Sequence, residues 1–156
     1  VRLEHGRLAA AEATLETDAV LIDLWRLLEE EGAPVSVARR GVADLLAEGL
    51  LAFSDAQIAF TERGSESARA AVRRSRLAEA LLARTLDRGT PEECGRGVPL
   101  AVGFEDQVCA FLDHPTQCPH GRAIPPAAGC CFPSLMLAGG AGGAGGAGLR
   151  VEGGGG

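Results

Sequence analysis

The segment from Phe104 to Cys131 constrains the fold of this chain more strongly than any other part of the sequence. It holds four of the five cysteines, two of the three histidines and four of the eight prolines. Prolines stiffen the backbone and interrupt helices, while thiol and imidazole groups are common ligands of transition metals. The sequence therefore predicts a loop-rich segment that holds a metal ion or a metal cluster.

Within this segment, apolar residues recur with the period of a helix, which predicts an amphipathic helix over residues 103–113. Its expected buried face consists of Phe104, Val108, Phe111 and Leu112. A proline follows His114, and the residue before a proline is pushed out of the helical conformation. The helix is therefore expected to end there.

The other ligand candidates of this segment are expected on loops, where ligands commonly lie. They are Cys118, His120, Cys130 and Cys131. Their spacing differs from the two-residue spacing of ordinary zinc knuckles, so residue type more than spacing points to a metal. His120 is a reserve ligand, because its ring could instead donate to a backbone carbonyl in the proline turn.

Cys94 precedes a stretch with two glycines and a proline, which predicts a further loop. The loops that carry the cysteines flank the 103–113 helix, so we expect Cys94, Cys118 and at least one cysteine of the 130–131 pair to bind a single metal centre. Cys109 is expected to pack as a small apolar residue and not to be a ligand. For His114 two interpretations stay open, a helix C-cap or a ligand.

The composition predicts one domain, or two small ones, in the cytoplasm. Hydrophobic residues make up 46% of the chain, yet the longest apolar runs are only a few residues, so no transmembrane span is expected. The N-terminus lacks the charged-then-apolar layout of a signal peptide. In the cytoplasm, an odd number of cysteines indicates reduced thiols or metal ligands and not a disulfide framework.

The net charge is −6, and all 15 basic residues are arginines. Only the middle third of the chain, residues 33–88, has more arginines than carboxylates, so only this part is expected to present a weakly positive face. Four arginines of the longest predicted helix are expected on a solvated face. They are Arg69, Arg73, Arg74 and Arg76.

The first regular elements are predicted from caps and periodicity. Residues 1–17 are expected to be helical or frayed. A sharper helix then starts at a cap formed by Thr17 or Asp18 and ends at Gly32. Its apolar face consists of Leu21, Leu24, Trp25 and Leu28.

A second helix is expected to open at Pro34 and Ser36, and to bury Val42, Leu45 and Leu46. Two strand-forming runs, LLAF and QIAF, then predict a hairpin whose loop is residues 54–56.

A long helix is expected to follow the hairpin, capped by Thr61 and ending near Leu86. Thr90 and Pro91 predict a further helix start. Residues 134–156 are rich in glycine and alanine and are expected to be disordered.

The order of these motifs resembles the iron-dependent repressor (DtxR-like) family over roughly residues 18–131. The most specific matches are VRRSRLAEALL and HPTQCPHGRAIP, and the others are LIDLWRLLEEEG, VSVARR, EGLL and FTERG. The resemblance implies a mainly α fold, with an abbreviated winged helix-turn-helix in residues 18–75 and a metal-binding and dimerisation domain in residues 76–133. Many members add an SH3-like domain, and here a glycine-rich tail takes its place.

Proteins of this family are cytoplasmic homodimeric regulators that bind operator DNA and ferrous iron or manganese. The resemblance makes Glu79 a metal ligand, although Ser75 stands where the family has a histidine, and aliphatic residues occupy most of its other ligand positions. The cysteines are therefore expected to replace the usual site. Thiolates suit iron, zinc or an iron–sulfur cluster and are poor ligands for manganese.

The predicted function is a metal-responsive, DNA-binding transcriptional regulator that dimerises through the region after Arg84. Residues 35–50 have room for only one good helix, whereas a full helix-turn-helix needs two. Arg39, Arg40 and the hairpin around Ser54 are expected to form whatever DNA surface remains. The alternative is a dimeric metal or cluster protein that no longer reads DNA.

An enzyme is not expected. Cys118 and His120 could be read as a nucleophile and its base, but they flank a proline, and no third group that would orient them is apparent.

Overall fold

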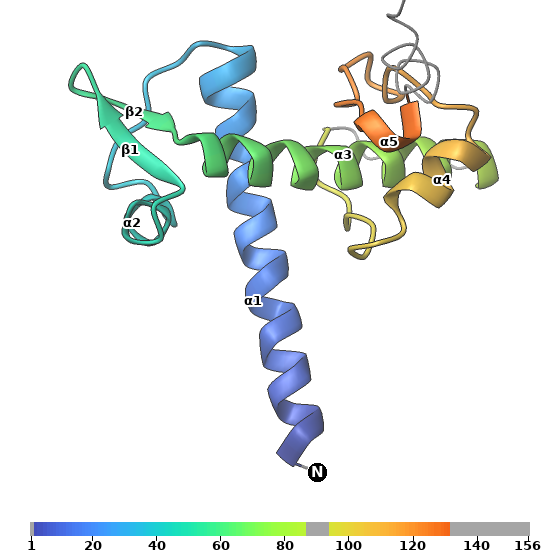
Figure 1. The fold of residues 1–156 in the computed structure, drawn as a ribbon, viewed down its shortest axis with the longest axis horizontal. Coiled ribbons are helices and arrows are strands. Elements are labelled where there is room, and N and C mark those ends of the chain that lie inside the picture. The colour runs from blue at the N-terminus through green and yellow to red at the C-terminus, as the bar shows by residue number, and fades with distance from the viewer. Residues whose placement is uncertain (1, 87–93, 132–156) are drawn as a thin grey trace, which may run out of the picture.

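The computed structural model of the protein describes the backbone of residues 2–86 and 94–131, with side chains from residue 10 onward (Figure 1). These residues form a mainly helical fold with one two-stranded sheet, as the sequence predicts. The helix predicted at Thr90 and the tail predicted over residues 134–156 lie outside the described residues. In chain order the elements are α1 (Arg2–Trp25), the π-helical turn η1 (Arg26–Glu30), α2 (Val42–Ala47), β1 (Leu51–Ser54), β2 (Gln57–Phe60), α3 (Glu62–Thr85), α4 (Glu105–Phe111) and α5 (Ala128–Cys131).

Helix α3 is the central element of the fold (Figure 1). The hairpin and α2 lie at its N-terminal end, α4 and α5 lie at its C-terminal end, and α1 crosses it between them. One buried apolar cluster packs on each half of α3, the first reaching Ala71 and the second starting at Leu77. We call the parts around these clusters the N-terminal half (residues 10–75) and the C-terminal half (residues 76–86 and 94–131).

The first helix begins at Arg2, and not at a cap near residue 18 as predicted. Neither expected cap residue acts as one. The Thr17 hydroxyl donates to the Ala13 carbonyl inside the helix, and the Asp18 carboxylate accepts from Arg74 on α3. The predicted apolar face is confirmed for Leu21 and Leu24, which are buried, while Trp25 and Leu28 pack at the edge of the same cluster.

Helix α2 is shorter than predicted, because the chain between Ser36 and Gly41 forms turns instead of a helix. Ser36 caps a local turn by accepting from the amide of Ala38 at 3.2 Å. Gly41 has a φ of 82° and lies against Val20, whose side chain would be 2.8 Å from an added Cβ. The helix therefore starts only at Val42, which is buried as predicted together with Leu45.

The predicted hairpin is confirmed, with Leu51 paired to Phe60 and Ser54 paired to Gln57. Its two-residue tip, Asp55 and Ala56, has positive φ values of 50° and 62°. Two consecutive residues of this conformation form the tight turn whose twist suits a hairpin. The tip achieves this conformation without glycine.

The start of α3 is fixed against the hairpin by two residues of the FTERG motif. The Thr61 hydroxyl accepts from the Gly64 amide at 3.0 Å, which confirms the predicted N-cap, and donates to the Gly49 carbonyl at 2.8 Å. A Cβ at Gly64 would lie 1.8 Å from the carbonyl oxygen of Leu50. Only glycine allows this close approach, so the motif sets the angle at which α3 leaves the sheet.

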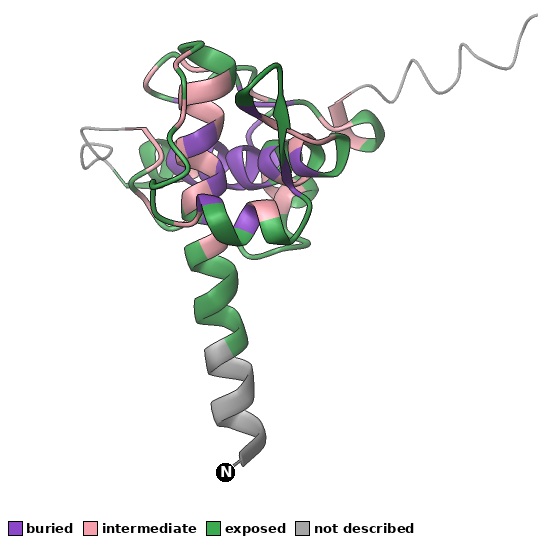
Figure 2. Cartoon of the chain, turned by 90° about the vertical axis from the view of Figure 1, so that its left-hand side faces the viewer, coloured by how far each residue is buried: buried purple, intermediate pink, exposed green. Residues whose placement is uncertain are grey.

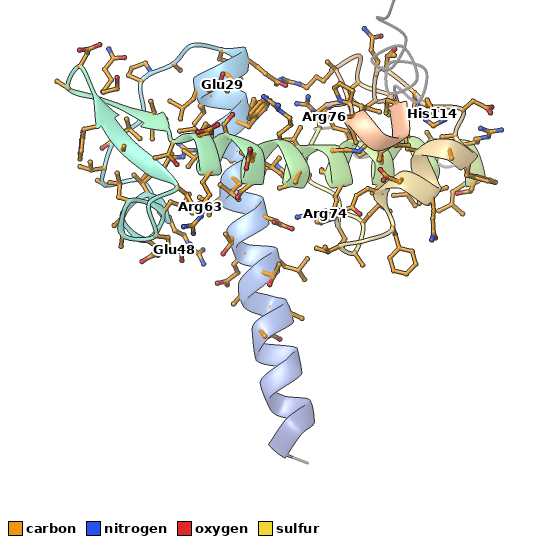
Figure 3. The ribbon with its side chains drawn as sticks, viewed as in Figure 1. Glu29, Glu48, Arg63, Arg74, Arg76 and His114 are labelled. Carbon is orange, nitrogen blue, oxygen red and sulfur yellow. The ribbon has the colours of Figure 1, made fainter. Side chains whose placement is uncertain are left out.

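Of the four α3 arginines predicted to lie on a solvated face, only Arg69 is exposed. Arg73, Arg74 and Arg76 are 5%, 7% and 4% exposed and belong to the buried stretch of α3 (Figure 2). Arg74 pairs with Asp18 at 2.7 Å, while Arg76 and the more exposed Arg122 both pair with Glu30. Ion pairs of Arg74 and Arg76 therefore connect α3 to α1 and to η1 (Figure 3).

Helix α4 buries only part of the predicted face, because Leu112 is buried and Val108 packs against the same cluster, but the two phenylalanines are exposed. Phe104 and Phe111 are 55% and 59% exposed, whereas Cys109 is fully buried and Leu112 is nearly so. The Arg84 guanidinium lies 5.3 Å from the centre of the Phe111 ring and partly covers it. The side of α4 that packs against α3 therefore carries Cys109 and neither of the aromatic rings.

Candidate metal centres

Two groups of four potential metal ligands lie in the C-terminal half of the described chain. The Glu79 group consists of Glu79, Cys94, Cys118 and His120, and the Cys109 group consists of Cys109, His114, Cys130 and Cys131. In each group the four ligand atoms all lie within 4.8 Å of one another. Each group therefore has the size of a single coordination shell.

The Glu79 group brings together three segments. Glu79 is a fully buried residue of α3, and Cys94 lies in a turn that packs next to it. Cys118 and His120 share a tight turn, in which the Gly121 amide donates to the Cys118 carbonyl at 2.8 Å. The Cys118 amide also donates to the Arg122 carbonyl at 2.9 Å, so the turn directs its thiol and imidazole to the same side.

Distances within the Glu79 group centre on one carboxylate oxygen. Glu79 Oε2 is 3.4 Å from Cys94 Sγ and 3.2 Å from His120 Nδ1. Cys94 Sγ lies 3.7 Å from Cys118 Sγ, which is 3.9 Å from His120 Nδ1. The other oxygen, Glu79 Oε1, accepts from the Gly95 amide at 2.6 Å, so one carboxylate oxygen is held by the backbone and the other faces the ligands.

The Cys109 group joins α4 to α5. Cys109 Sγ is 3.5 Å from His114 Nδ1 and 3.7 Å from Cys131 Sγ, and Cys130 Sγ is 3.5 Å from the same imidazole nitrogen. His114 has a φ of 53°, and its amide donates to the Cys109 carbonyl at 2.8 Å. This arrangement turns the histidine back over the end of α4.

The distances can be compared with the edges of a tetrahedral coordination shell. Metal–sulfur distances of about 2.3 Å and metal–nitrogen or metal–oxygen distances of about 2.0–2.1 Å place two sulfurs about 3.8 Å apart, and a sulfur and a nitrogen about 3.5 Å apart. The Cys109 group has 3.7, 3.5 and 3.5 Å for such pairs. In the Glu79 group, the sulfur pair is at 3.7 Å and one sulfur–nitrogen pair is longer, at 3.9 Å. Both donor sets fit a tetrahedral divalent ion.

A single ion fits these groups better than an iron–sulfur cluster. A cluster distributes its four protein ligands over two or four iron atoms, so the ligands lie farther apart than those around one ion. Here all four ligand atoms of each group lie within 4.8 Å. Thiolate, imidazole and carboxylate ligands suit zinc or ferrous iron.

Thiol acidity differs among the cysteines and not simply between the groups, because burial and a hydrogen bond with Cys109 raise the pKa of Cys130 in the Cys109 group to about 12. Burial, the negative charge of Glu79 and the neighbouring Cys118 raise the pKa of the Cys94 thiol to about 12. Burial alone would raise the pKa of Cys131 too, but a backbone hydrogen bond at Ala127 and contacts with Cys109 and Arg73 lower it to about 7. Since metals bind thiolates, an ion entering the Glu79 group has to displace a firmly held proton.

The structure differs from the predicted single centre, because it divides the cysteines between two groups. Cys94 and Cys118 lie together with Glu79 and His120, while Cys130 and Cys131 lie elsewhere. The reason is the short helix α5, which carries the last two cysteines onto α4. Glu79 was found through the family resemblance and through no feature of its own.

Two members of the Cys109 group were not predicted as ligands. Cys109 is buried as expected, but its sulfur belongs to a four-residue group instead of being surrounded by apolar atoms alone. Of the two interpretations of His114, the ligand fits the distances, because its Nδ1 lies 3.5 Å from the sulfurs of both Cys109 and Cys130. His114 itself is labelled in Figure 3. The signal in the sequence was the recurrence of cysteine and histidine within one short helix and its end.

The residues predicted to contact DNA lie on the surface of the N-terminal half. Arg39 pairs with Asp23 on α1, and Arg26 donates to the same carboxylate at 3.0 Å. Arg40 is 89% exposed and lies 3.7 Å from Glu16. Ser54 is exposed at the hairpin tip. The ion pair with Asp23 offsets part of the positive charge of Arg39.

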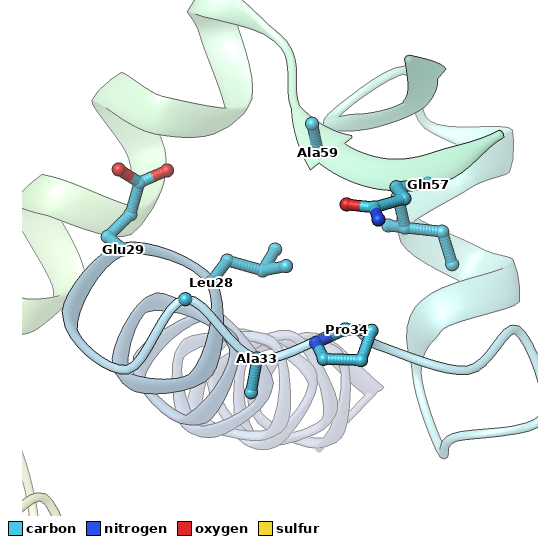
Figure 4. Close-up of a pocket in the computed structure, with 8 residues that line it drawn as sticks. Leu28, Glu29, Ala33, Pro34, Gln57 and Ala59 are labelled. Carbon is cyan, nitrogen blue, oxygen red and sulfur yellow. The ribbon is translucent and has the colours of Figure 1, made fainter. Parts of the chain in front are cut away.

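A hollow of about 280 Å³ lies in the N-terminal half, between η1 and β2 (Figure 4). Leu28, Pro34 and Gln57 are among its lining residues, and Glu29 is the one charged residue among the described lining. It contains none of the metal-ligand candidates, and we assign it no function.

Comparison with known proteins gives a likeness of fold. No family model matches the chain, and no curated protein matches its sequence. It is similar to the structure of the manganese regulator SloR, with 24% identity, a TM-score of 0.56 and coverage of 70% of this chain and 60% of that one. It is also similar to ScaR with bound Zn²⁺, with 25% identity, a TM-score of 0.51 and coverage of 72% of this chain and 59% of that one.

These neighbours support the resemblance to the iron-dependent repressor family at the level of the fold. The chain spans about 60% of the length of each. Among the described helices, none is long and apolar enough to cross a membrane.

Proposed function

We propose that the protein is a metal-responsive transcriptional regulator whose regulatory metal binds the Glu79 group. The observation that carries this proposal is the place of that group at the junction of the two halves of the molecule. Glu79 lies on the helix that connects the hairpin to the C-terminal half, and its ligand partners come from segments that contact both α3 and the N-terminal half.

Two sets of contacts connect this site to the first helix and its extension. Gly95, next to Cys94, has a φ of 87° and packs against Ile22 of α1, whose methyl carbon would be 2.9 Å from an added Cβ. Arg122, which closes the Cys118 turn, pairs with Glu30 of η1. A shift of the Cys94 segment therefore changes its packing on α1, and a shift of the Cys118 turn changes its ion pair with η1.

A bound divalent ion would supply the charge that stabilises two thiolates and a carboxylate at one point. The protein's own contribution is to hold the donors ready. Gly95 fixes one oxygen of Glu79, and the 118–121 turn fixes the Cys118 thiol and the His120 ring. Without the ion, the raised pKa of Cys94 keeps this thiol protonated at neutral pH, and two segments lose a shared partner.

The proposed partners are operator DNA and a second copy of the chain. DNA would meet Arg39, Arg40 and the hairpin around Ser54, in the part of the chain with a net positive charge. The second copy would cover the apolar side chains exposed in the C-terminal half. These are Leu82, Leu86, Val98, Val102, Phe104 and Phe111.

A second candidate function is a dimeric metal-binding protein that no longer reads DNA sequence. Helix α2 has only six residues, whereas a recognition helix usually enters the major groove over several turns. The ion pair between Arg39 and Asp23 further reduces the positive charge offered to phosphates. These two observations favour weak or non-specific binding.

DNA binding as a function of metal and salt separates the two candidates. The protein is purified without oxygen, loaded with zinc or ferrous iron, and titrated against a pool of genomic promoter fragments in a fluorescence anisotropy assay. A regulator binds more tightly with metal, and its affinity falls steeply with salt because phosphate contacts release counterions. Glu79→Gln should lose the metal effect, while Glu66→Gln, an exposed residue on the same helix, should keep it. Equal binding with and without metal would leave only the second candidate, whatever its salt dependence, because non-specific phosphate contacts also weaken with salt.

A further inference from the structure

We propose that Cys109, His114, Cys130 and Cys131 form a second metal site, separate from the Glu79 group, which takes one zinc ion and clamps α5 onto α4. The site is structural, because its ligands come from neighbouring elements of the C-terminal half and not from the junction between the halves. This proposal does not depend on DNA binding, and only the zinc count of two in its test also rests on the proposed metal site at the Glu79 group.

The geometry is that of three thiolates and an imidazole around one point. The sulfurs of Cys109 and Cys131 are 3.7 Å apart, too far for a disulfide bond and close to the edge of a zinc tetrahedron. His114 Nδ1 lies 3.5 Å from the sulfurs of Cys109 and Cys130, which matches the sulfur–nitrogen edge. Four protein ligands and no open position are typical of structural zinc sites.

The position of α5 requires a strong contact of this kind. The helix has four residues, none of them buried, and a helix of this length is not stable by itself in water. The amides of Cys130 and Cys131 donate only to the local carbonyl of Ala127. With so little apolar surface to bury, ligation of its two cysteines is the interaction best able to hold α5 on α4.

The end of α4 is also shaped for ligation. Asp113 and His114 have positive φ values of 59° and 53°, a conformation that is uncommon outside glycine, although Asp and His adopt it more readily than most residues. Such conformations persist where surrounding contacts compensate for them. Here the strained pair brings the His114 ring back to the sulfur of Cys109, five residues earlier.

Charge balance supports the same assignment. A zinc ion with three thiolates and a neutral imidazole carries a net charge of −1. The buried guanidinium of Arg73 lies beside it, with Nη1 3.5 Å from Cys131 Sγ and 2.9 Å from the Pro125 carbonyl. Its carboxylate neighbour, Asp106, is largely exposed and 3.4 Å away. A negatively charged centre at Cys131 gives this buried cation a counter-charge inside the protein.

The test counts zinc ions per chain in the full-length protein, purified without oxygen and measured by elemental mass spectrometry. The native chain should bind two. The double variant Cys130→Ser with Cys131→Ser should bind one, and Cys118→Ser should bind one, because each removes a different site. Thr116→Ala, an exposed substitution in the same loop, should still bind two. If both cysteine variants lose all zinc, or if the double variant keeps two ions, the separate site does not exist.

Thiol alkylation gives an independent readout that does not need the double variant to fold. In zinc-loaded Cys118→Ser protein, Cys109, Cys130 and Cys131 should resist N-ethylmaleimide, and a chelator should expose them together. Alkylation of the 130–131 pair at equal rates with and without zinc would overturn the proposal. A Cys109–Cys131 disulfide in protein kept free of oxygen would overturn it as well.

Discussion

The two halves of the molecule are stabilised by different kinds of contact. The N-terminal half encloses a cluster of buried aliphatic side chains, among them Leu24 and Val42, which are fully buried. In the C-terminal half, two of the five buried members of the cluster are cysteines that belong to the candidate metal centres. The first half is therefore expected to be stable by hydrophobic burial alone, and the second to depend on metal.

Metal removal should have the largest effect. It should lower the stability of the C-terminal half and leave that of the N-terminal half nearly unchanged. Chelation of zinc should destabilise residues 94–131 by about 4 kcal/mol, if the ion is initially present at about a thousand times its Kd. Hydrogen exchange measured by mass spectrometry should show faster exchange there, with little change around Leu24. Equal loss of protection in both halves would mean that they are not stabilised separately.

A substitution in the hydrophobic core of the N-terminal half should have the opposite effect, with lower stability and no loss of metal. Leu24→Ala removes a fully buried side chain and should cost about 3 kcal/mol, through lost burial and the remaining cavity. Urea denaturation of the metal-loaded protein measures this cost, and the zinc content of the folded protein should stay unchanged. Leu15→Ala, at a half-exposed position on the same helix, is the matched control and should change stability by less than about 0.5 kcal/mol.

The C-terminal half also differs from the N-terminal half in its proposed role in dimer formation. Its exposed aromatic rings are apolar surface that one chain does not bury by itself. Phe104→Ser with Phe111→Ser should weaken the proposed dimer by about 2 kcal/mol or more, which is over about tenfold in the dissociation constant. Sedimentation or light scattering across a concentration series measures the effect. Phe53→Ser, at an exposed position on the hairpin, should leave association unchanged.

The smallest expected effect concerns Asp23 in the N-terminal half. Burial by itself raises the pKa of this carboxyl, but Arg39 and Arg26 lower it below its usual value. A depressed folded-state pKa gives stability that is present above the unfolded value near 3.8 and is lost as the pH falls through the folded value. Asp23→Asn should therefore flatten the acid limb of stability slightly, by under about 1 kcal/mol, in urea denaturation at several pH values.

The same variant tests the DNA surface. With Asp23 neutral, Arg39 is released, and DNA affinity and its salt dependence should both increase modestly. Glu12→Gln, at an exposed carboxylate on α1, is the control for the change in net charge. A larger increase for the control than for Asp23→Asn would place the DNA surface away from Arg39.

Local patterns predicted the N-terminal half well. The hairpin and the Thr61 cap depend on residues that are close in sequence, and both are as predicted. The start of α2 was misplaced because Gly41 takes its conformation from packing against Val20, which lies 21 positions earlier in the chain. Periodicity indicates which face of a helix is apolar, but not where a distant segment interrupts it.

In the C-terminal half, the residue types predicted the kind of chemistry, but they did not predict which residues lie together. Cysteine and histidine content indicated metal binding, but the loops alone suggested one centre. The buried arginines were misjudged for a related reason. A charged helical face is solvated unless other segments cover it, and Arg74 is covered because Asp18, 56 positions earlier, lies against it.

By itself, the sequence determined the kinds of element and the kinds of chemistry: helices, one hairpin, and a thiol- and imidazole-rich segment over residues 104–131. These follow from short-range periodicity, caps and side-chain type, which act within a few residues of the chain. Only the tertiary structure decided that the candidate ligands form two groups, that Phe104 and Phe111 stay exposed, and that Arg73, Arg74 and Arg76 are buried. Each of these depends on which distant segments pack together, and that is decided by the burial and charge pairing of the whole chain.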